Sequence, residues 1–229
     1  MKPEPLLKLA LFDLDHTLLP LDSDQSWGEF TLQLGWVDEG AFRQRNNDFY
    51  ADYNAGCLDI HEYVRFATRS LRERSWPEAQ AAHRQFMEQV IQPAIRPEAL
   101  ALVSHHRALG EKLVMVTATN EFVTAPIAQA FGMDVLLAVE LERDASGHFT
   151  GEIAGVPTLR EGKVTRVSQW LAQQGLDWAQ VQATFYSDST NDLPLLEKVQ
   201  TPVVTNPSPA LRQIAQQRAW RILDLFEHP

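Results

Sequence analysis

The sequence is poor in cysteine: its 229 residues contain one, Cys57. A single cysteine cannot form an internal disulfide, and with only scattered histidines around it in the sequence it cannot begin a thiolate zinc site. We expect Cys57 to behave as a semi-buried small apolar residue. The length also excludes a disulfide-stapled mini-protein, because 229 residues can bury a hydrophobic core as one domain or as one domain with an insertion.

Basic residues and long apolar runs are also scarce. Lysine and arginine total 20 against 30 aspartates and glutamates, which gives a net charge of −10. That sign disfavours a nucleic-acid partner, since phosphate backbones are bound by basic surfaces. No stretch approaches the ~20 apolar residues needed to cross a bilayer, and the first residues show no cleavage-site pattern. We therefore expect no membrane association and a cytoplasmic location.

What the sequence does contain is a series of apolar runs that alternate with helical patterns. Residues 6–14 are nearly all apolar and end in acids, which is typical of a strand buried on both faces of a parallel sheet. Alternation of strand and helix predicts a Rossmann-like, three-layer α/β core with a parallel sheet. After Pro93 we expect strands at 112–117, near 135, at 181–186 and at 202–205, helices at 97–110, 121–131, 161–174 and 192–199, and a hairpin around 144–147.

Residues 22–92 have a different character. They are rich in arginine, glutamine and alanine at helical spacing, and no convincing strand interrupts them. Three or four helices fit this length, and Pro77 suits the first turn of one of them. We expect an α-helical cap at 22–92, inserted into a core formed by residues 1–21 and 93–229.

The segment Asp13-Leu-Asp15-His-Thr17 follows the first predicted strand. Ligands of open α/β sheets bind at the carboxyl ends of the strands. Two carboxylates two residues apart concentrate negative charge there, which is costly unless a proton or a cation offsets it. Mg²⁺ is a natural partner, because it takes oxygen ligands and keeps waters that a phosphate can replace. A solvated acidic loop is the alternative, and this motif alone does not decide between the two.

A second acidic segment, Tyr186-Ser-Asp188-Ser-Thr-Asn191-Asp192, ends another apolar strand. Because the carboxyl ends of parallel strands share one edge, these acids face the same edge as the first motif. Capping of the following helix is the alternative explanation, since Ser, Thr, Asn and Asp satisfy free N–H groups. Capping does not require Asp188 and Asp192 together.

Two weaker signals complete the set. Thr117-Ala118-Thr119 ends a third buried strand and offers hydroxyls and open N–H groups before a helix, an arrangement suited to phosphate. Lys163 lies at the start of a predicted helix, where a cation opposes the helix dipole. Taken alone, each has an ordinary structural explanation: a common strand end, and a surface lysine.

In this order the four segments resemble the motifs of the haloacid dehalogenase-like hydrolase superfamily. Its members carry Asp-x-Asp-x-Thr after the first strand, Ser or Thr after the second, a Lys at a helix start, and an acidic motif. The resemblance extends from Asp13 to Asp192. The helical insertion is similar to the cap of the phosphoserine-phosphatase-like branch, which also includes bacterial histidinol-phosphate phosphatases.

The resemblance implies roles for four residues. Asp13 is expected to be the nucleophile that accepts the phosphoryl group, and Asp15 the acid that protonates the leaving alcohol and then activates water. Thr117 is expected to hydrogen-bond the phosphoryl oxygens, and Lys163 to pair with both Asp13 and the phosphate.

The resemblance also implies one cofactor, Mg²⁺. Its expected ligands are Asp13, the main-chain carbonyl of Asp15, and Asp188. Further positions are expected around the phosphate and these ligands: Ala118, Thr119, Asn191 and Asp192.

An Asp two residues after the nucleophile resembles the phosphatases and phosphomutases of the superfamily. The expected reaction is hydrolysis of a small phosphorylated metabolite through an aspartyl-phosphate. A phosphomutase or phosphotransferase, and a non-catalytic binding protein on the same scaffold, stay open as alternatives. The chain departs from the phosphoserine-phosphatase pattern at Ala118 and Thr119 and at Ser187 and Ser189, where glycines are usual. The oligomeric state is not predicted.

Substrate-selecting residues are expected in the cap. Asp22 falls where phosphoserine-cleaving relatives place an acid for the substrate amine, and Arg65 resembles the arginine that holds the substrate carboxylate. Asp24 adds another acid, so the substrate is expected to be an amine-bearing ester such as histidinol phosphate or phosphoserine. For Asp22 and Arg65 an exposed helix charge is an equally good explanation. Aromatic residues that could stack on an imidazole, or fill the cap core, are Trp27, Phe49, Tyr50 and Tyr53.

Overall fold

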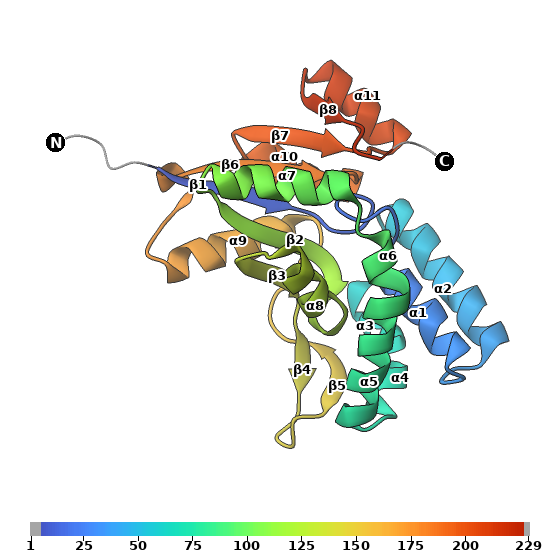
Figure 1. The fold of residues 1–229 in the computed structure, drawn as a ribbon. Helices are drawn as coiled ribbons and strands as arrows, with labels where there is room; N and C mark the ends of the chain where they lie inside the picture. The colour runs from blue at the N-terminus through green and yellow to red at the C-terminus, as the bar shows by residue number, and fades with distance from the viewer. Residues whose placement is uncertain (1–5, 227–229) are drawn as a thin grey trace.

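A six-stranded parallel sheet forms the centre of the molecule (Figure 1). The computed structural model describes residues 6–226. The strand order is β3-β2-β1-β6-β7-β8. The chain therefore runs outward from β1 in both directions, which places the carboxyl end of β1 at the switch point where open α/β sheets bind ligands. The strands are β1 (Leu7–Phe12), β2 (Lys112–Asn120), β3 (Val135–Val139), β6 (Val181–Ser187), β7 (Thr201–Thr205) and β8 (Arg221–Leu223).

Helices cover both faces of this sheet, which confirms the expected three-layer α/β core. Ala10 and Phe12 of β1 point into one apolar cluster with α7 and α8, whereas Leu9 and Leu11 point into a second with α9, α10 and α11. The apolar run of β1 follows from this, because both faces of the strand are buried. The helices are α7 (Pro97–Ala108), α8 (Glu121–Phe131), α9 (Glu161–Gln173), α10 (Leu193–Lys198) and α11 (Pro209–Gln217), with short 3₁₀ turns η2 (Trp178–Gln180) and η3 (Thr190–Asp192).

Residues 22–92 form helices joined by short connections, with no strand between them, as predicted, but they form more helices than the three or four expected. Two of them are separated only by Thr68, which the sequence pattern does not distinguish from one longer helix. Pro77 lies in the first turn of α5, after the capping box of Ser75 and Glu78. The helices are α1 (Ser23–Gln33), α2 (Glu39–Asn54), α3 (Ile60–Ala67), α4 (Arg69–Arg72) and α5 (Trp76–Phe86).

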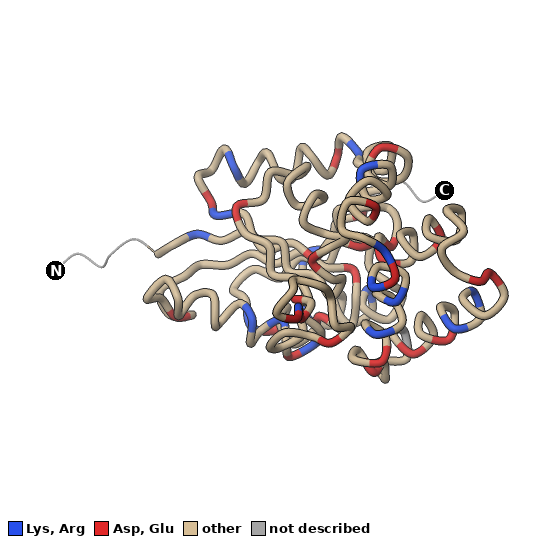
Figure 2. The backbone as a smooth tube through the Cα atoms, turned by 90° about the horizontal axis from the view of Figure 1, so that it is seen from below, with Lys and Arg blue, Asp and Glu red and all other residues tan. Residues whose placement is uncertain are grey.

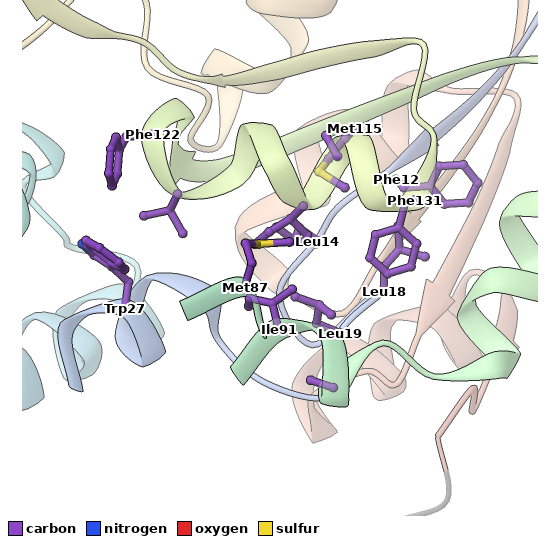
Figure 3. Packing of buried hydrophobic residues seen from close by; sticks show 14 of the residues in the cluster. Phe12, Leu14, Leu18, Leu19, Trp27, Met87, Ile91, Met115, Phe122 and Phe131 are labelled. Carbon is purple, nitrogen blue, oxygen red and sulfur yellow. The ribbon is translucent and has the colours of Figure 1, made fainter. Parts of the chain in front are cut away.

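The chain returns to the core through a π-helical turn, η1 (Met87–Ile91), followed by α6 (Gln92–Ala94). Figure 3 shows Met87 beside Leu14, and Ile91 beside Leu19, so this turn packs on the loop that follows β1. All four side chains are buried. The return segment and the first-motif loop therefore share one hydrophobic cluster, which packs beneath the carboxyl edge of the sheet.

A small antiparallel hairpin, β4 (Leu141–Arg143) and β5 (Phe149–Ile153), lies beside the helical segment (Figure 1). It confirms the hairpin predicted around 144–147. The ring of Phe149 lies 6.0 Å from that of Trp76, which joins the hairpin to α5.

The structure contradicts the prediction for the single cysteine. Cys57 is exposed rather than semi-buried, because it lies in the polar connection between α2 and α3 with its Sγ 3.7 Å from Asp52 Oδ1.

Figure 2 shows acidic and basic residues mixed along the helices. Within residues 6–226, no helix combines the length and the apolar character that crossing a membrane would require.

Candidate active site

The loop after β1 brings two of the predicted acids together. Asp13 directly follows β1 and is buried, and its backbone N–H donates to Tyr186 O at 2.9 Å. Thr17 Oγ1 lies 3.3 Å from both Asp13 Oδ2 and Asp188 Oδ1, and the Asp188 N–H donates to the same hydroxyl at 3.1 Å. Thr17 therefore holds the carboxyl ends of β1 and β6 against each other, as the shared sheet edge predicts.

Lys163 is fully buried and pairs with two carboxylates. Its Nζ lies 2.7 Å from Asp13 Oδ1 and 2.7 Å from Asp192 Oδ2, and Ser187 Oγ donates to the same Asp192 oxygen at 2.7 Å. Burial alone would lower the pKa of the Lys163 ammonium, but the two carboxylates outweigh burial and raise that pKa. The lysine is thus a fixed cation at the sheet edge, and the surface alternative is excluded.

The backbone before Lys163 explains how this cation is placed. A Cβ on Gly162 would lie 1.9 Å from Pro157 O, so only glycine allows the start of α9 to pack under the preceding loop. Arg160 has a φ of 53°, in the region that non-glycine residues seldom occupy. This tight turn delivers Lys163 to the acids despite the unfavourable helix dipole.

The side chain of Asp15 is held by two hydrogen bonds. The Ser23 N–H donates to Oδ1 at 2.7 Å, and Thr119 Oγ1 donates to Oδ2 at 2.8 Å. Burial, and then the charge of Asp22, raise the pKa of the Asp15 carboxyl to about 6. A carboxyl with that pKa can both give and take a proton near neutrality. Thr119 in turn donates its N–H to Thr117 Oγ1 at 3.1 Å.

Two acids lie on the helical side of the site. Asp22 caps α1, accepting from the Gln25 N–H at 2.8 Å, and burial raises its pKa. Asp24 is 8% exposed and accepts a hydrogen bond from Asn120 Nδ2 at 3.3 Å. Burial, and then the charge of Asp22, raise the pKa of Asp24 to about 7, although a hydrogen bond with Tyr63 acts the other way. No cation offsets the burial of Asp22 or Asp24 in the way that Lys163 does for Asp13 among the residues described here.

These groups surround one cavity of about 1470 Å³ between the sheet edge and the helical segment. Phe49, Tyr50, Tyr53 and Tyr63 add aromatic surface on the helical side. The predicted residues that line the cavity are Asp13, Asp15, Asp22, Asp24, Thr117, Ala118, Thr119, Asp188 and Asn191. Lys163 and Asp192 lie just behind Asp13, at hydrogen-bond distance in the chain Asp13–Lys163–Asp192.

Arg65 is placed elsewhere. Its guanidinium is exposed and pairs with Glu152 of β5, with Nη1 3.2 Å from Oε2. It does not line the cavity. Arg65 therefore belongs to the contact between α3 and the hairpin. Its position nine residues after a glycine does not determine which side of the helix the arginine faces.

Three residues make contacts around the cavity that the sequence analysis did not assign to them. Thr17 stands four residues after Asp13, and the Asp-x-Asp-x-Thr spacing was the available signal for it. Asn120 follows the Thr117–Thr119 segment and caps α8, accepting from the Val123 N–H at 3.2 Å. Tyr63 has no local signal, because its contact with Asp24 depends on how α3 packs.

The donor set suits a hard cation. Within the described chain no three His, Cys, Asp or Glu side chains form a ready-made metal cage. The predicted set instead has two carboxylates, Asp13 and Asp188, and the main-chain carbonyl of Asp15. Asp192 Oδ1 is buried without a hydrogen-bond partner, and burial, Asp13 and Asp192 together raise the pKa of Asp188. A few carboxylate ligands and an excess of negative charge fit Mg²⁺, which keeps several waters.

Comparison with known proteins agrees with this geometry. The model of the haloacid dehalogenase-like hydrolase family matches residues 10–197. A histidinol-phosphatase from Neisseria meningitidis serogroup C (strain 8013) is 40% identical over 217 residues, covering 94% of this chain and 98% of its own length. A protein named for inhibition of morphological differentiation in Streptomyces azureus is 32% identical, covering 96% of this chain and 79% of its own.

Solved structures share the fold. A protein of unknown function from Bordetella pertussis Tohama I is 48% identical, with a TM-score of 0.90, covering 96% of this chain and all of its own. A substrate-bound phosphoserine phosphatase has a TM-score of 0.67 at 15% identity, covering 96% of this chain and 94% of its own. The chain therefore belongs to the haloacid dehalogenase-like hydrolase family, and its relatives place it among that family's phosphatases.

Proposed function

We propose that this protein is a Mg²⁺-dependent phosphomonoesterase that hydrolyses a small amine-bearing phosphate ester through an aspartyl-phosphate on Asp13. The proposal rests on the two contacts that hold the Asp13 carboxylate in place. Lys163 Nζ holds Oδ1 at 2.7 Å, and Thr17 Oγ1 lies 3.3 Å from Oδ2. Such contacts fix the direction of a nucleophilic carboxylate at the mouth of the cavity.

The reaction would proceed in two displacements. A carboxylate oxygen of Asp13 attacks phosphorus, and the ester oxygen leaves as the alcohol with a proton from Asp15. Asp15, now ionised, takes a proton from water as the water oxygen attacks phosphorus, which breaks the bond to the Asp13 carboxylate and releases inorganic phosphate. Thr119 Oγ1 and the Ser23 N–H keep the Asp15 carboxyl fixed through both steps.

Asp13, Asp188 and the main-chain carbonyl of Asp15 would hold Mg²⁺, which supplies positive charge to a phosphoryl group bound beside them. The protein's own contribution is a second cation, Lys163, whose Nζ lies 2.7 Å from Asp13 Oδ1. Thr117 and the open end of β2 would hydrogen-bond the phosphoryl oxygens.

The helical side of the cavity supports an amine-bearing substrate. Asp24 is buried there, Asp22 is half-buried, and aromatic rings flank them. Among the cavity-lining residues that the structure describes, Arg96 is the sole lysine or arginine, and it precedes α7 on the core side. An ammonium or imidazolium group would supply the missing charge and stack on the rings. The relative named histidinol-phosphatase favours histidinol phosphate over phosphoserine, and residues 22–92 would act as the cap that closes over it.

Phosphate release from an aryl phosphate tests the reaction. We expect turnover with Mg²⁺, little without it, and none for Asp13→Asn, which should keep the thermal midpoint of the wild type within a few degrees. Turnover retained by Asp13→Asn would remove Asp13 as the nucleophile. Turnover that requires a bisphosphate activator, or that yields a new phosphate ester on an added alcohol instead of inorganic phosphate, would indicate the phosphomutase or phosphotransferase alternative.

A second assay tests the substrate class. The kcat/KM values for histidinol phosphate, O-phosphoserine and glycerol phosphate would be compared at one Mg²⁺ concentration. We expect the amine-bearing esters to exceed glycerol phosphate by about tenfold or more, since about 1.4 kcal/mol of differential binding gives that factor. Equal values for all three would contradict recognition of an amine.

A further inference from the structure

We propose that Asn206 is a positioning residue that holds the loop of the nucleophile, residues 13–22, in its working conformation. The proposal rests on the proposed function of Asp13 and assigns to the end of β7 a part in the same reaction. Asn206 lies two strands away from β1 in the sheet, and no motif of the sequence marks it.

The Asn206 side chain joins two separate segments. Its amide nitrogen donates to His16 O at 2.9 Å, and Thr17 O lies 3.4 Å from the same nitrogen. Its amide oxygen accepts from the N–H groups of Leu225 and Phe226, at 2.7 and 3.0 Å. One side chain thus satisfies main-chain groups of the nucleophile loop and of the segment after β8.

The backbone of Asn206 suits this position. Its φ of 47° lies in the left-handed region, where asparagine is one of the few non-glycine residues found regularly. Its own N–H donates to Leu223 O at 2.9 Å, so the residue is fixed to β8 before the side chain reaches the loop.

The segment that Asn206 contacts needs support. His16 has a φ of 55°, a conformation that is costly for a side chain with a Cβ and persists only where its surroundings hold it. Thr17 follows directly, and its hydroxyl lies between the carboxylates of Asp13 and Asp188. A shift of the His16 and Thr17 carbonyls would move that hydroxyl.

The same connection also reaches the other side of the site. The Ser208 N–H donates to Asp188 O at 3.1 Å, two residues after Asn206. The link between β7 and α11 therefore touches both strand ends that Thr17 joins, with a side chain at the β1 loop and a main-chain amide at β6. Of these contacts, a substitution can remove those that the Asn206 side chain makes.

Two substitutions distinguish the hydrogen bonds that the Asn206 side chain donates to the loop from those that it accepts from the segment after β8. Asn206→Asp keeps an acceptor for Leu225 and Phe226 and tolerates the left-handed backbone, but it has no donor for the loop. Asn206→Gly also allows the left-handed backbone conformation, and it removes both sets of side-chain hydrogen bonds without adding charge. We expect both to lower kcat for an aryl phosphate by about 10- to 100-fold with KM changed less than threefold, because small misplacement of a reacting group has effects of that size.

Hydrogen exchange measured by mass spectrometry supplies a readout that does not depend on turnover. The amides of His16, Thr17, Leu18 and Leu19 are hydrogen-bonded inside the loop, so they should exchange faster in both variants. The amides of Leu225 and Phe226 should exchange faster only in Asn206→Gly. A kcat within threefold of the wild type for both variants, or loop exchange that is unchanged in both, would overturn the proposal.

Arg212→Gln is the matched control. Arg212 of α11 pairs with Asp224 at the protein surface, so this change loosens the terminal segment without touching the nucleophile loop. We expect its kcat and loop exchange to match the wild type. An equal loss of kcat in Arg212→Gln would assign the effect to the terminal segment and overturn the role of Asn206. If the wild type itself released no phosphate, the proposed function would fail, while the exchange comparison would still decide whether Asn206 holds the loop.

Discussion

Two groups of acids lie on opposite sides of the same cavity and differ in one respect, the presence of a protein cation. On the sheet side Asp13 and Asp192 share Lys163, at 2.7 Å each. On the helical side the half-buried Asp22 and the buried Asp24 accept hydrogen bonds from a helix N-terminus and an asparagine amide. The charge of the first group is partly offset within the fold, whereas the second group has a cost of burial that a cationic ligand would remove.

In the proposed function, this difference lets one cavity serve chemistry and selection at once. Charge that must stay in place during phosphoryl transfer would be fixed by a lysine that the fold itself positions. Charge that serves recognition would be completed by the substrate, so the binding energy would depend on the charge that the ligand carries. Five predictions from four variants test this difference, from the largest expected effect to the smallest.

Lys163→Met should have the largest effect. It leaves Asp13 and Asp192 buried without a cation, and breaking one partner of a buried pair costs about 3–5 kcal/mol. Turnover should be lost. The loss in the free energy of unfolding should be smaller at pH 5 than at pH 8, because protonation can neutralise the orphaned carboxyls. Urea unfolding at both pH values measures it, with Lys112→Gln as control, since that exposed lysine lies 3.8 Å from Asp134. A pH-independent loss would contradict the pairing.

Gly162→Ala should disturb Lys163 without changing any charge. The new Cβ would meet Pro157 O at 1.9 Å, so the start of α9 must move. Overpacking of this kind costs about 1–3 kcal/mol, and we expect kcat to fall more than KM changes. Gly40→Ala in α2 is the matched control, because its Cβ would meet Asp38 Oδ1 at an ordinary 3.8 Å. Thermal unfolding and steady-state kinetics measure both variants, and wild-type behaviour of Gly162→Ala would refute the steric argument.

Asp24→Asn should act on the helical side alone. The KM for an amine-bearing ester should rise about tenfold while the KM for an aryl phosphate stays within twofold. Asp38→Asn, at the exposed N-terminus of α2, serves as a control for the same chemical change on the helical segment. Equal effects on both substrates would show that Asp24 does not contact an amine.

The same variant sharpens the comparison through pH. The pKa of Asp24 is about 7 in the folded protein, against an ordinary value of 3.8. Between these values the native protein keeps a proton that the unfolded chain has released. The free energy of unfolding should therefore fall as pH rises from about 4 to 7, by at most about 1.4 kcal/mol per unit from this group. Asp24→Asn should show a shallower fall in urea titrations, and an identical slope would contradict the raised pKa.

Arg65→Ala should have the smallest effect. The pair between Arg65 and Glu152 is exposed, and such pairs contribute about 0.2–1 kcal/mol. Because Arg65 lies outside the cavity, the KM for O-phosphoserine should change less than twofold. A tenfold rise would restore the role that the sequence resemblance suggested for this arginine.

The sequence predicts the sheet side of this molecule better than the helical side. Strand β1 is a continuous apolar run ending in Asp13, and its neighbours end in polar residues, so parallel pairing brings them to one edge. Helix α11 and strand β8 were not predicted, although Ser208-Pro209 is a usual N-terminal signal for a helix. The final strand has only three residues, too few for a periodicity to emerge.

The helical side is harder because its contacts depend on packing between helices. The resemblance to phosphoserine-cleaving proteins put Asp22 and Arg65 forward as equal candidates, yet one lines the cavity and the other faces the hairpin. Tyr63 and Asn120 reach Asp24 from two different elements, and neither position is marked by a local pattern. Lys163 was predicted from its motif, whereas Gly162, which makes its position possible, becomes informative only when the approach of Pro157 is visible.

The single exposed thiol gives this protein a practical property. Cys57 lies in the turn between α2 and α3, beside Gly56, and a Cβ on Gly56 would lie 3.9 Å from both Arg160 Nη2 and Asn191 Oδ1. A maleimide dye would attach at one defined place, and its fluorescence would report on the surroundings of this turn. Because the chain has no second cysteine, a disulfide-linked dimer on a non-reducing gel would reflect handling of the sample.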